Sequence, residues 1–155
     1  VGEGPDNDWM KQLKASAGDG VVFAGHRTGH ALETLFRTAS AYVTTSELEG
    51  LPSSVLEAME RRSCVVASDI PPHRLLLDGA GTGDLIFPVG DVDALCQRLA
   101  RVLDDDASRD AYADQQRAHV RADYAWDVLA ERVSDFYRDV VSSRKQAISS
   151  ASQGV

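Results

Sequence analysis

The stretch that decides the fold is Ser46-Glu47-Leu48-Glu49-Gly50-Leu51-Pro52-Ser53-Ser54-Val55-Leu56-Glu57-Ala58-Met59. A short loop rich in Gly, Pro and Ser runs here straight into the first turn of a helix. The apolar segment Ala41–Val43 precedes the loop, and Val65–Ser68 follows the helix. The pattern therefore predicts a strand, a loop, a helix and a second strand, in that order.

The junction between this loop and its helix predicts a phosphate site. A helix N-terminus presents unpaired backbone N–H groups and the positive end of the helix dipole, which together attract an anion. Glu49 and Glu57 stand on either side of the junction. Carboxylates accept hydrogen bonds from hydroxyl groups, such as those of a sugar or a ribose. The combination indicates a site for a sugar attached to a nucleotide diphosphate.

Short apolar runs alternate with helical patterns over the first part of the chain. Strands are predicted at Val21–Ala24, Tyr42–Thr44, Val65–Ser68 and Leu85–Phe87. Helices are predicted near Asp8–Ala17, His30–Ala39 and Ser54–Arg61. Such alternation implies right-handed crossovers and a parallel sheet that helices cover on both faces.

The last third of the chain is predicted to be helical. Asp91 is a predicted N-cap, a second helix begins at Ser108, and a third begins near Ala125. The third helix carries a wide apolar stripe, which must pack against something. Its members are Trp126, Leu129, Val133, Phe136, Tyr137 and Val140. We expect residues 1–141 to form one partial domain and residues 142–155 to form a disordered tail.

Composition excludes several classes of function. The 155 residues are 43% apolar, which is enough for a folded core, and their net charge of −8 argues against a nucleic-acid partner. No run reaches the roughly 18 apolar residues of a transmembrane segment, and no signal peptide opens the chain. Cys64 and Cys96 form no motif. They indicate reduced thiols in a cytoplasmic protein.

The residues between Glu49 and Ile70 carry a family resemblance. Glu49-x7-Glu57, followed by Val65-Val66-Ala67-Ser68-Asp69-Ile70, resembles the signature of retaining GT-B glycosyltransferases, and most closely of glycosyltransferase family 4, also called glycosyl transferases group 1. The similarity is collinear over about residues 1–141. Further matching segments are Val1–Pro5, Val22–His26, Asp78–Asp91 and Tyr124–Trp126.

The resemblance implies a fold and a set of donor contacts. The fold is a Rossmann-like, doubly wound α/β sheet, the C-terminal half of a GT-B fold truncated at its N-terminus and followed by C-terminal helices. Glu57 would bind the ribose hydroxyls, and Glu49 would be the catalytic carboxylate beside the transferred sugar. Two further sets would contact the donor: Gly50, Leu51, Pro52, Ser53 and Ser54 at the diphosphate, and Gly25 and His26 near the base or sugar. Backbone N–H groups of Leu51, Ser53 and Ser54 would hold the phosphates, since Pro52 has none.

The resemblance also implies a reaction. Such enzymes move a hexose, with retention, from a UDP-, GDP- or ADP-sugar to a glycan, a glycolipid or a small acceptor. They use no metal ion and no cofactor. The acceptor-binding N-terminal domain and the first two strands of the C-terminal domain are missing, so the fragment alone is expected to be inactive. Peripheral contact with the inner face of a membrane would come from the missing domain.

Two alternative functions remain open. One is a non-catalytic nucleotide-sugar-binding subunit that works with a separate acceptor-binding chain. The other is a sugar-nucleotide epimerase of similar architecture, although the Glu-Gly-Leu-Pro loop fits that class less well. Whether the chain is a natural split subunit or a piece of a longer enzyme is open as well.

Three local features have simpler structural interpretations. Ser54 and Glu57 have the spacing of a capping box, in which the Glu57 carboxylate accepts from the Ser54 amide. This role is compatible with a ribose contact. His73 lies in Pro71-Pro72-His73-Arg74, which is predicted to be a surface turn. Arg62 stands where the family has a glycine that supplies the left-handed turn after the helix, so the turn is expected to be reshaped in this chain.

Overall fold

The computed structural model describes residues 7–152, and it describes side chains through residue 144. The predicted family match at Val1–Pro5 lies outside the described residues. The elements are, in order, α1 (Asp8–Ser16), α2 (Gly29–Thr38), β1 (Tyr42–Thr44), α3 (Ser53–Glu60), β2 (Val65–Ser68), α4 (Pro71–Gly79), the 3-10 helix η1 (Gly83–Leu85), β3 (Ile86–Phe87), α5 (Val92–Leu103), α6 (Asp106–Asp123) and α7 (Trp126–Ser152).

The sheet has three short parallel strands in the order β1-β2-β3. Tyr42 pairs in register with Val65, and Ala67 pairs with Ile86. Every residue of the central strand β2 is buried, as expected for a parallel strand that is covered on both faces. The predicted α/β class and its parallel sheet are confirmed.

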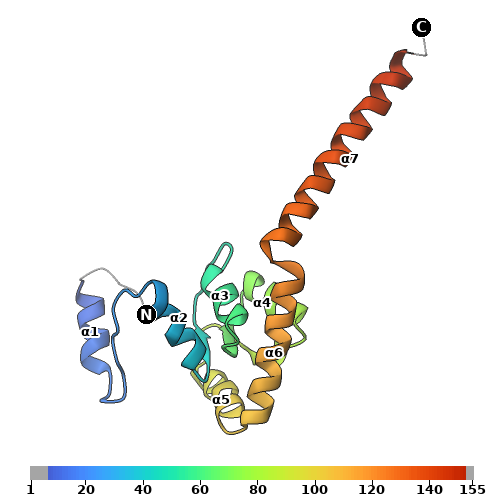
Figure 1. The fold of residues 1–155 in the computed structure, drawn as a ribbon. Helices are drawn as coiled ribbons and strands as arrows, with labels where there is room; N and C mark the ends of the chain where they lie inside the picture. Colours follow the sequence, from blue (N-terminus) through green and yellow to red (C-terminus); the bar gives the residue numbers. More distant parts are fainter. Residues whose placement is uncertain (1–6, 153–155) are drawn as a thin grey trace.

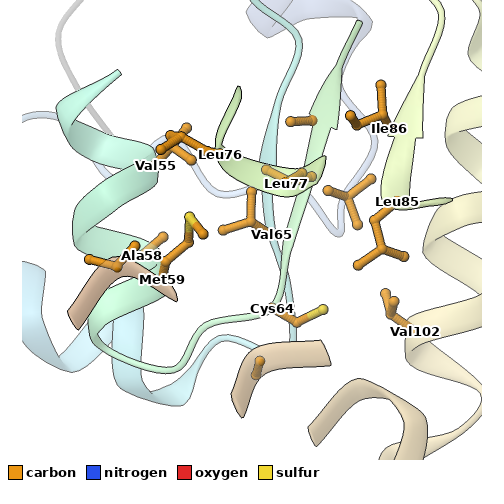
Figure 2. Close-up of a cluster of buried hydrophobic side chains, with 14 of the residues drawn as sticks. Val55, Ala58, Met59, Cys64, Val65, Leu76, Leu77, Leu85, Ile86 and Val102 are labelled. Carbon is orange, nitrogen blue, oxygen red and sulfur yellow. The ribbon is translucent and has the colours of Figure 1, made fainter. Parts of the chain in front are cut away.

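The core lies between α3, the sheet and the helices α4, α5 and α6. Figure 2 shows Val55 and Met59 of α3 beside Val65 and Leu76, while Leu85 and Val102 lie on the other side of β2. All of these side chains are at most 1% exposed. Burying one large apolar side chain contributes roughly 1.5–3 kcal/mol, so this cluster fixes α3 and its N-terminus against the sheet.

The predicted strand at Val21–Ala24 is wrong. The segment has no regular structure, and Val21 and Val22 are 54% and 84% exposed. A strand needs neighbours for its backbone N–H and C=O groups. No strand of the described chain lies beside this segment, because the sheet contains only β1, β2 and β3. Its apolar residues therefore remain open to water.

The predicted surface turn at Pro71–Arg74 is also wrong. These residues form the first turn of α4, and His73 is fully buried. Proline is well suited to the first position of a helix, because its φ is already helical. The backbone N–H that proline lacks would have no intrahelical acceptor at this position. The pair of prolines thus marked a helix start, a signal that can be found in the sequence.

The C-terminal helices begin close to the predicted residues. Asp91 caps α5, since its carboxylate accepts from the Ala94 amide at 2.8 Å. Helix α6 begins at Asp106 rather than Ser108, because Asp105 caps it through the amides of Ala107 and Ser108.

Helix α7 is longer than the sequence indicated. It continues to Ser152, although we expected a disordered tail from residue 142. Elongating an existing helix is far easier than starting one, and Arg, Lys, Gln and Ala at residues 144–147 are good helix formers.

Figure 1 shows α7 projecting away from the other elements. The stripe on this helix is largely exposed: Trp126 is 88% exposed, and Phe136 and Tyr137 are each 64% exposed. None of the helices in residues 7–152 is long and apolar enough to cross a membrane.

Candidate functional site

The predicted site lies where the chain leaves β1 and enters α3. In an α/β sheet, ligands bind outside the carboxyl ends of the parallel strands, and the loop at residues 45–52 begins at such an end. Apolar packing of Val55 and Met59 holds the start of α3 beside β1. The loop itself is largely exposed, and Leu48 and Leu51 are 89% and 69% exposed.

A hollow of about 590 Å³ adjoins the start of α3. Four predicted donor residues line it: His26, Ser53, Ser54 and Glu57. The hollow runs along β1, whose outer edge has no partner strand in the described part of the chain. The other five predicted residues do not line it: Gly25, Glu49, Gly50, Leu51 and Pro52.

The hollow also has an apolar wall and a positive charge. Leu32, Phe36 and Tyr42 supply apolar surface from α2 and β1. The sequence interpretation assigned no role to this wall, although the helical spacing of Leu32, Leu35 and Phe36 was visible. Arg27 brings a guanidinium group to the rim, and its Nη1 donates to the His26 carbonyl at 3.0 Å.

The capping box predicted at Ser54 and Glu57 is wrong. The N-cap of α3 is Pro52, which makes no side-chain capping bond, and Ser53 is the first helical residue. Ser54 lies within the first turn, two positions after the N-cap, and is therefore too late for the reciprocal bonds of the motif. The Glu57 carboxylate instead lies 3.7 Å from the Arg61 guanidinium, and its side chain is 47% exposed.

The backbone N–H groups at the helix start differ in availability. The Ser53 amide donates to the Leu51 carbonyl at 2.9 Å, so it is already used inside the turn. Within residues 7–152, the amides of Leu51 and Ser54 make no hydrogen bond. The Pro52 carbonyl accepts from the amides of Val55 and Leu56 and so fixes the first turn of α3.

Glu49 does not line the hollow and takes part in a hydrogen-bond network of its own. The Ser46 hydroxyl donates to Glu49 Oε1 at 2.8 Å, and the Thr44 and Ser46 hydroxyls are 3.2 Å apart. Ser68, at the end of β2, donates to the Ser46 carbonyl at 2.5 Å. The carboxyl ends of β1 and β2 thus hold the loop that carries Glu49.

A second arginine near the strand ends is already neutralised. Arg74 of α4 forms a bidentate pair with the Asp69 carboxylate, and its guanidinium lies 3.9 Å from Asp78. Arg27 makes no ion pair within the described residues. Of these two arginines, Arg27 is the one able to meet an added anion.

The family model and the similar proteins agree on the class of protein that this chain resembles. Residues 1–119 match the family described as "Glycosyl transferases group 1". A lipopolysaccharide core biosynthesis mannosyltransferase of Rhizobium leguminosarum bv. viciae is 28% identical, over 86% of this chain and 37% of the relative. A phosphatidyl-myo-inositol mannosyltransferase of Mycobacterium tuberculosis is 31% identical, over 92% and 38%. An alpha-D-kanosaminyltransferase of Streptomyces kanamyceticus is 23% identical, over 90% and 36%. The chain spans a little over a third of the length of these relatives.

Proposed function

The chain belongs to group 1 of the glycosyl transferases, and we propose that it is the donor-binding part of a retaining hexosyltransferase that uses a nucleotide diphosphate sugar. The observation that carries the proposal is the shared hollow at the start of α3. It gathers His26, Ser53, Ser54 and Glu57, which the sequence had assigned to the donor independently of the structure.

Each part of the hollow suits one part of the donor. The free amide of Ser54, the N-terminus of α3 and the Arg27 guanidinium meet the diphosphate charge from the hollow, and the free amide of Leu51 meets it from the adjoining loop. The exposed Glu57 carboxylate accepts hydrogen bonds from the two ribose hydroxyls. The aromatic surface of Tyr42 lies against the base.

Sugar transfer separates positive from negative charge, and in this proposal different groups of the site stabilise each of the two charges. When the bond between the anomeric carbon and the diphosphate breaks, negative charge grows on the leaving phosphate. The amides, the helix N-terminus and Arg27 stabilise that charge. Positive charge grows on the sugar ring, and the Glu49 carboxylate stabilises it from the loop. The acceptor hydroxyl attacks the anomeric carbon, and its proton leaves with the phosphate oxygen. No metal ion or cofactor takes part in this scheme.

The names of the relatives refine the substrate classes. Two of the three relatives described above are called mannosyltransferases, which favours mannose as the hexose. Their names also mention lipopolysaccharide and phosphatidyl-myo-inositol. We therefore propose a lipid-linked acceptor at a membrane surface, bound by the part of the enzyme that this chain lacks. A non-catalytic donor-binding subunit would share the same hollow but would show no transfer in any longer form.

The test compares Glu57→Gln with Glu47→Gln in the full-length protein. Losing a charge-assisted hydrogen bond to the ribose costs roughly 1–3 kcal/mol, so Glu57→Gln is expected to bind the donor nucleotide about 5- to 150-fold more weakly. Its melting temperature should stay unchanged, because Glu57 caps no helix. Glu47 is an exposed carboxylate of the same loop, and its replacement should alter neither quantity.

Calorimetric titration with UDP, GDP and ADP measures the affinities. Equal affinity of the wild type and Glu57→Gln for every nucleotide that binds would refute the ribose role of Glu57. Transfer of labelled hexose from the preferred nucleotide sugar then separates an enzyme from a binding subunit.

A further inference from the structure

A directed chain of hydrogen bonds leads from β1 to Glu49. The Ser46 hydroxyl has one hydrogen, and it donates that hydrogen to Glu49 Oε1 over 2.8 Å. Towards Thr44, the Ser46 oxygen can therefore only accept. Thr44 Oγ1, at 3.2 Å, is then the donor of that pair. Both hydroxyls point their hydrogens along the chain towards the carboxylate.

A second chain reaches the Ser46 backbone from β2 and α4. His73 Nδ1 lies 2.9 Å from the Ser68 carbonyl, which can only accept, so Nδ1 carries the ring proton. The Ser68 hydroxyl lies 3.3 Å from the same nitrogen and donates its own hydrogen to the Ser46 carbonyl at 2.5 Å. His73 and Ser68 are fully buried, so this chain is anchored in the core.

The two hydrogen-bond chains meet at Ser46. The other four residues, Thr44, Glu49, Ser68 and His73, each belong to only one of them. Ser46 is partly exposed and belongs to no helix or strand. Its hydroxyl bonds only to Thr44 and to Glu49, within the described residues. Removing the hydroxyl therefore deletes no core packing, but it leaves the Glu49 carboxylate without the bond that fixes its direction.

We propose that Ser46 is a positioning residue, which holds the Glu49 carboxylate in the orientation that sugar transfer requires. This inference rests on the proposed function, because it takes Glu49 to stand beside the transferred sugar. In this proposal Ser46 acts through Glu49, to which its hydroxyl donates, and not by contact with the donor or the acceptor. Its loss should therefore slow the chemical step and leave donor binding unchanged, since Arg27, Ser54 and Glu57, which are proposed to bind the nucleotide, line the hollow and Ser46 does not.

The test uses three variants of the full-length enzyme: Ser46→Ala, Ser46→Thr and Thr45→Ala. Misplacing a catalytic group by about an ångström slows a reaction by up to about a hundredfold. We expect Ser46→Ala to lower kcat by about 10- to 100-fold, with an unchanged Kd for the nucleoside diphosphate and an unchanged melting temperature. Ser46→Thr keeps the hydroxyl and should recover most of the lost rate. Thr45 is the exposed neighbour, and Thr45→Ala should match the wild type.

Three outcomes would overturn the inference while the proposed function stands. They are a kcat of Ser46→Ala within about twofold of an active wild type, equal losses in Ser46→Ala and Ser46→Thr, and a nucleotide affinity that falls in step with kcat. A wild-type enzyme that transfers no hexose from any nucleotide sugar would instead refute the proposed function, and this inference with it.

Discussion

Replacing Gln116 by leucine is expected to destabilise the fold strongly. Gln116 lies on α6 and is fully buried. Its Oε1 accepts from the Val65 amide at 2.8 Å, and its Nε2 donates to the Val65 carbonyl at 3.1 Å and to Thr82 Oγ1 at 3.2 Å. The amide side chain thus takes the place of a peptide group beside the first residue of β2.

The sheet shows why the side-chain amide of Gln116 is needed in place of a neighbouring peptide group. Backbone groups of alternate β2 residues face the same neighbour, and Ala67 pairs with Ile86 of β3. Val65 therefore faces the β3 side as well. Strand β3 contains only Ile86 and Phe87 and is preceded by the 3-10 helix η1. No strand residue reaches Val65 on that side, and Gln116 satisfies both of its backbone groups.

The expected loss of stability follows from the backbone N–H and C=O of Val65, which Gln116→Leu leaves without hydrogen-bond partners. Each unsatisfied buried donor or acceptor costs about 1–3 kcal/mol, so Gln116→Leu should lose about 2–6 kcal/mol of unfolding free energy. The centre of that range, about 4 kcal/mol, is a large share of the roughly 5–15 kcal/mol by which a domain is stable. For a protein of this size it lowers the melting temperature by roughly 8–16 °C.

The assay is thermal unfolding followed by circular dichroism, with Gln115→Leu as the matched control. Gln115 is the next residue of α6 and is exposed, so its replacement should change stability by no more than about 0.5 kcal/mol. A Gln116→Leu protein that melts at the same temperature as the Gln115→Leu control would refute the reasoning.

Two further predictions concern acid and thiol chemistry. Hydrogen bonds from arginine side chains lower the pKa values of Glu60, Asp114 and Asp123 in the folded chain. Because the folded pKa values are depressed, these carboxylates contribute their full stability above the ordinary pKa values of 4.5 for Glu and 3.8 for Asp. That contribution is lost as the pH falls further through the folded pKa values. The melting temperature should fall between about pH 5 and pH 3, and a constant value over that interval would contradict this. Burial raises the pKa of the Cys64 thiol to about 12, whereas Cys96 is exposed. A disulfide reagent at neutral pH should modify Cys96 alone until urea unfolds the protein, and two fast thiols in the native state would count against the buried position of Cys64.

The sequence predicted elements well where the signal was local. The runs at Tyr42–Thr44 and Val65–Ser68 became strands, because their apolar side chains are buried whichever strands lie beside them. Val21–Ala24 has a similar composition but lacks a neighbour in the described chain, and a strand exists only as part of a pair. The start of α4 was missed because Pro71-Pro72 was interpreted as a turn rather than as the first turn of a helix.

The sequence predicted candidate site residues, of which some line one hollow, but it did not predict their hydrogen bonds. The predicted donor-binding positions came from one contiguous motif and a loop, and four of them line the hollow. The bond between Ser68 and the Ser46 carbonyl joins residues 22 positions apart. It depends on the pairing of β1 with β2, which no local pattern specifies. The N-cap was misplaced by two residues, because Pro52 and Ser54 both fit the start of α3.

The arrangement of α6 links the conformation of Arg62 to the loop that carries Glu49. Arg62 adopts φ 64°, so the left-handed turn is kept rather than reshaped as the sequence predicted, and a left-handed non-glycine residue costs about 1–2 kcal/mol. Its guanidinium forms a bidentate pair with Asp114 of α6, which compensates for the missing glycine by fixing the turn from outside. Two residues further along the same helix, Gln116 fixes Val65 at the start of β2. Helix α6 therefore holds both the turn and the first residue of the strand whose last residue, Ser68, donates to the loop. A change in α6 should reach the site through β2, and this is why we place the determinants of Glu49 geometry in the sheet as well as in the loop.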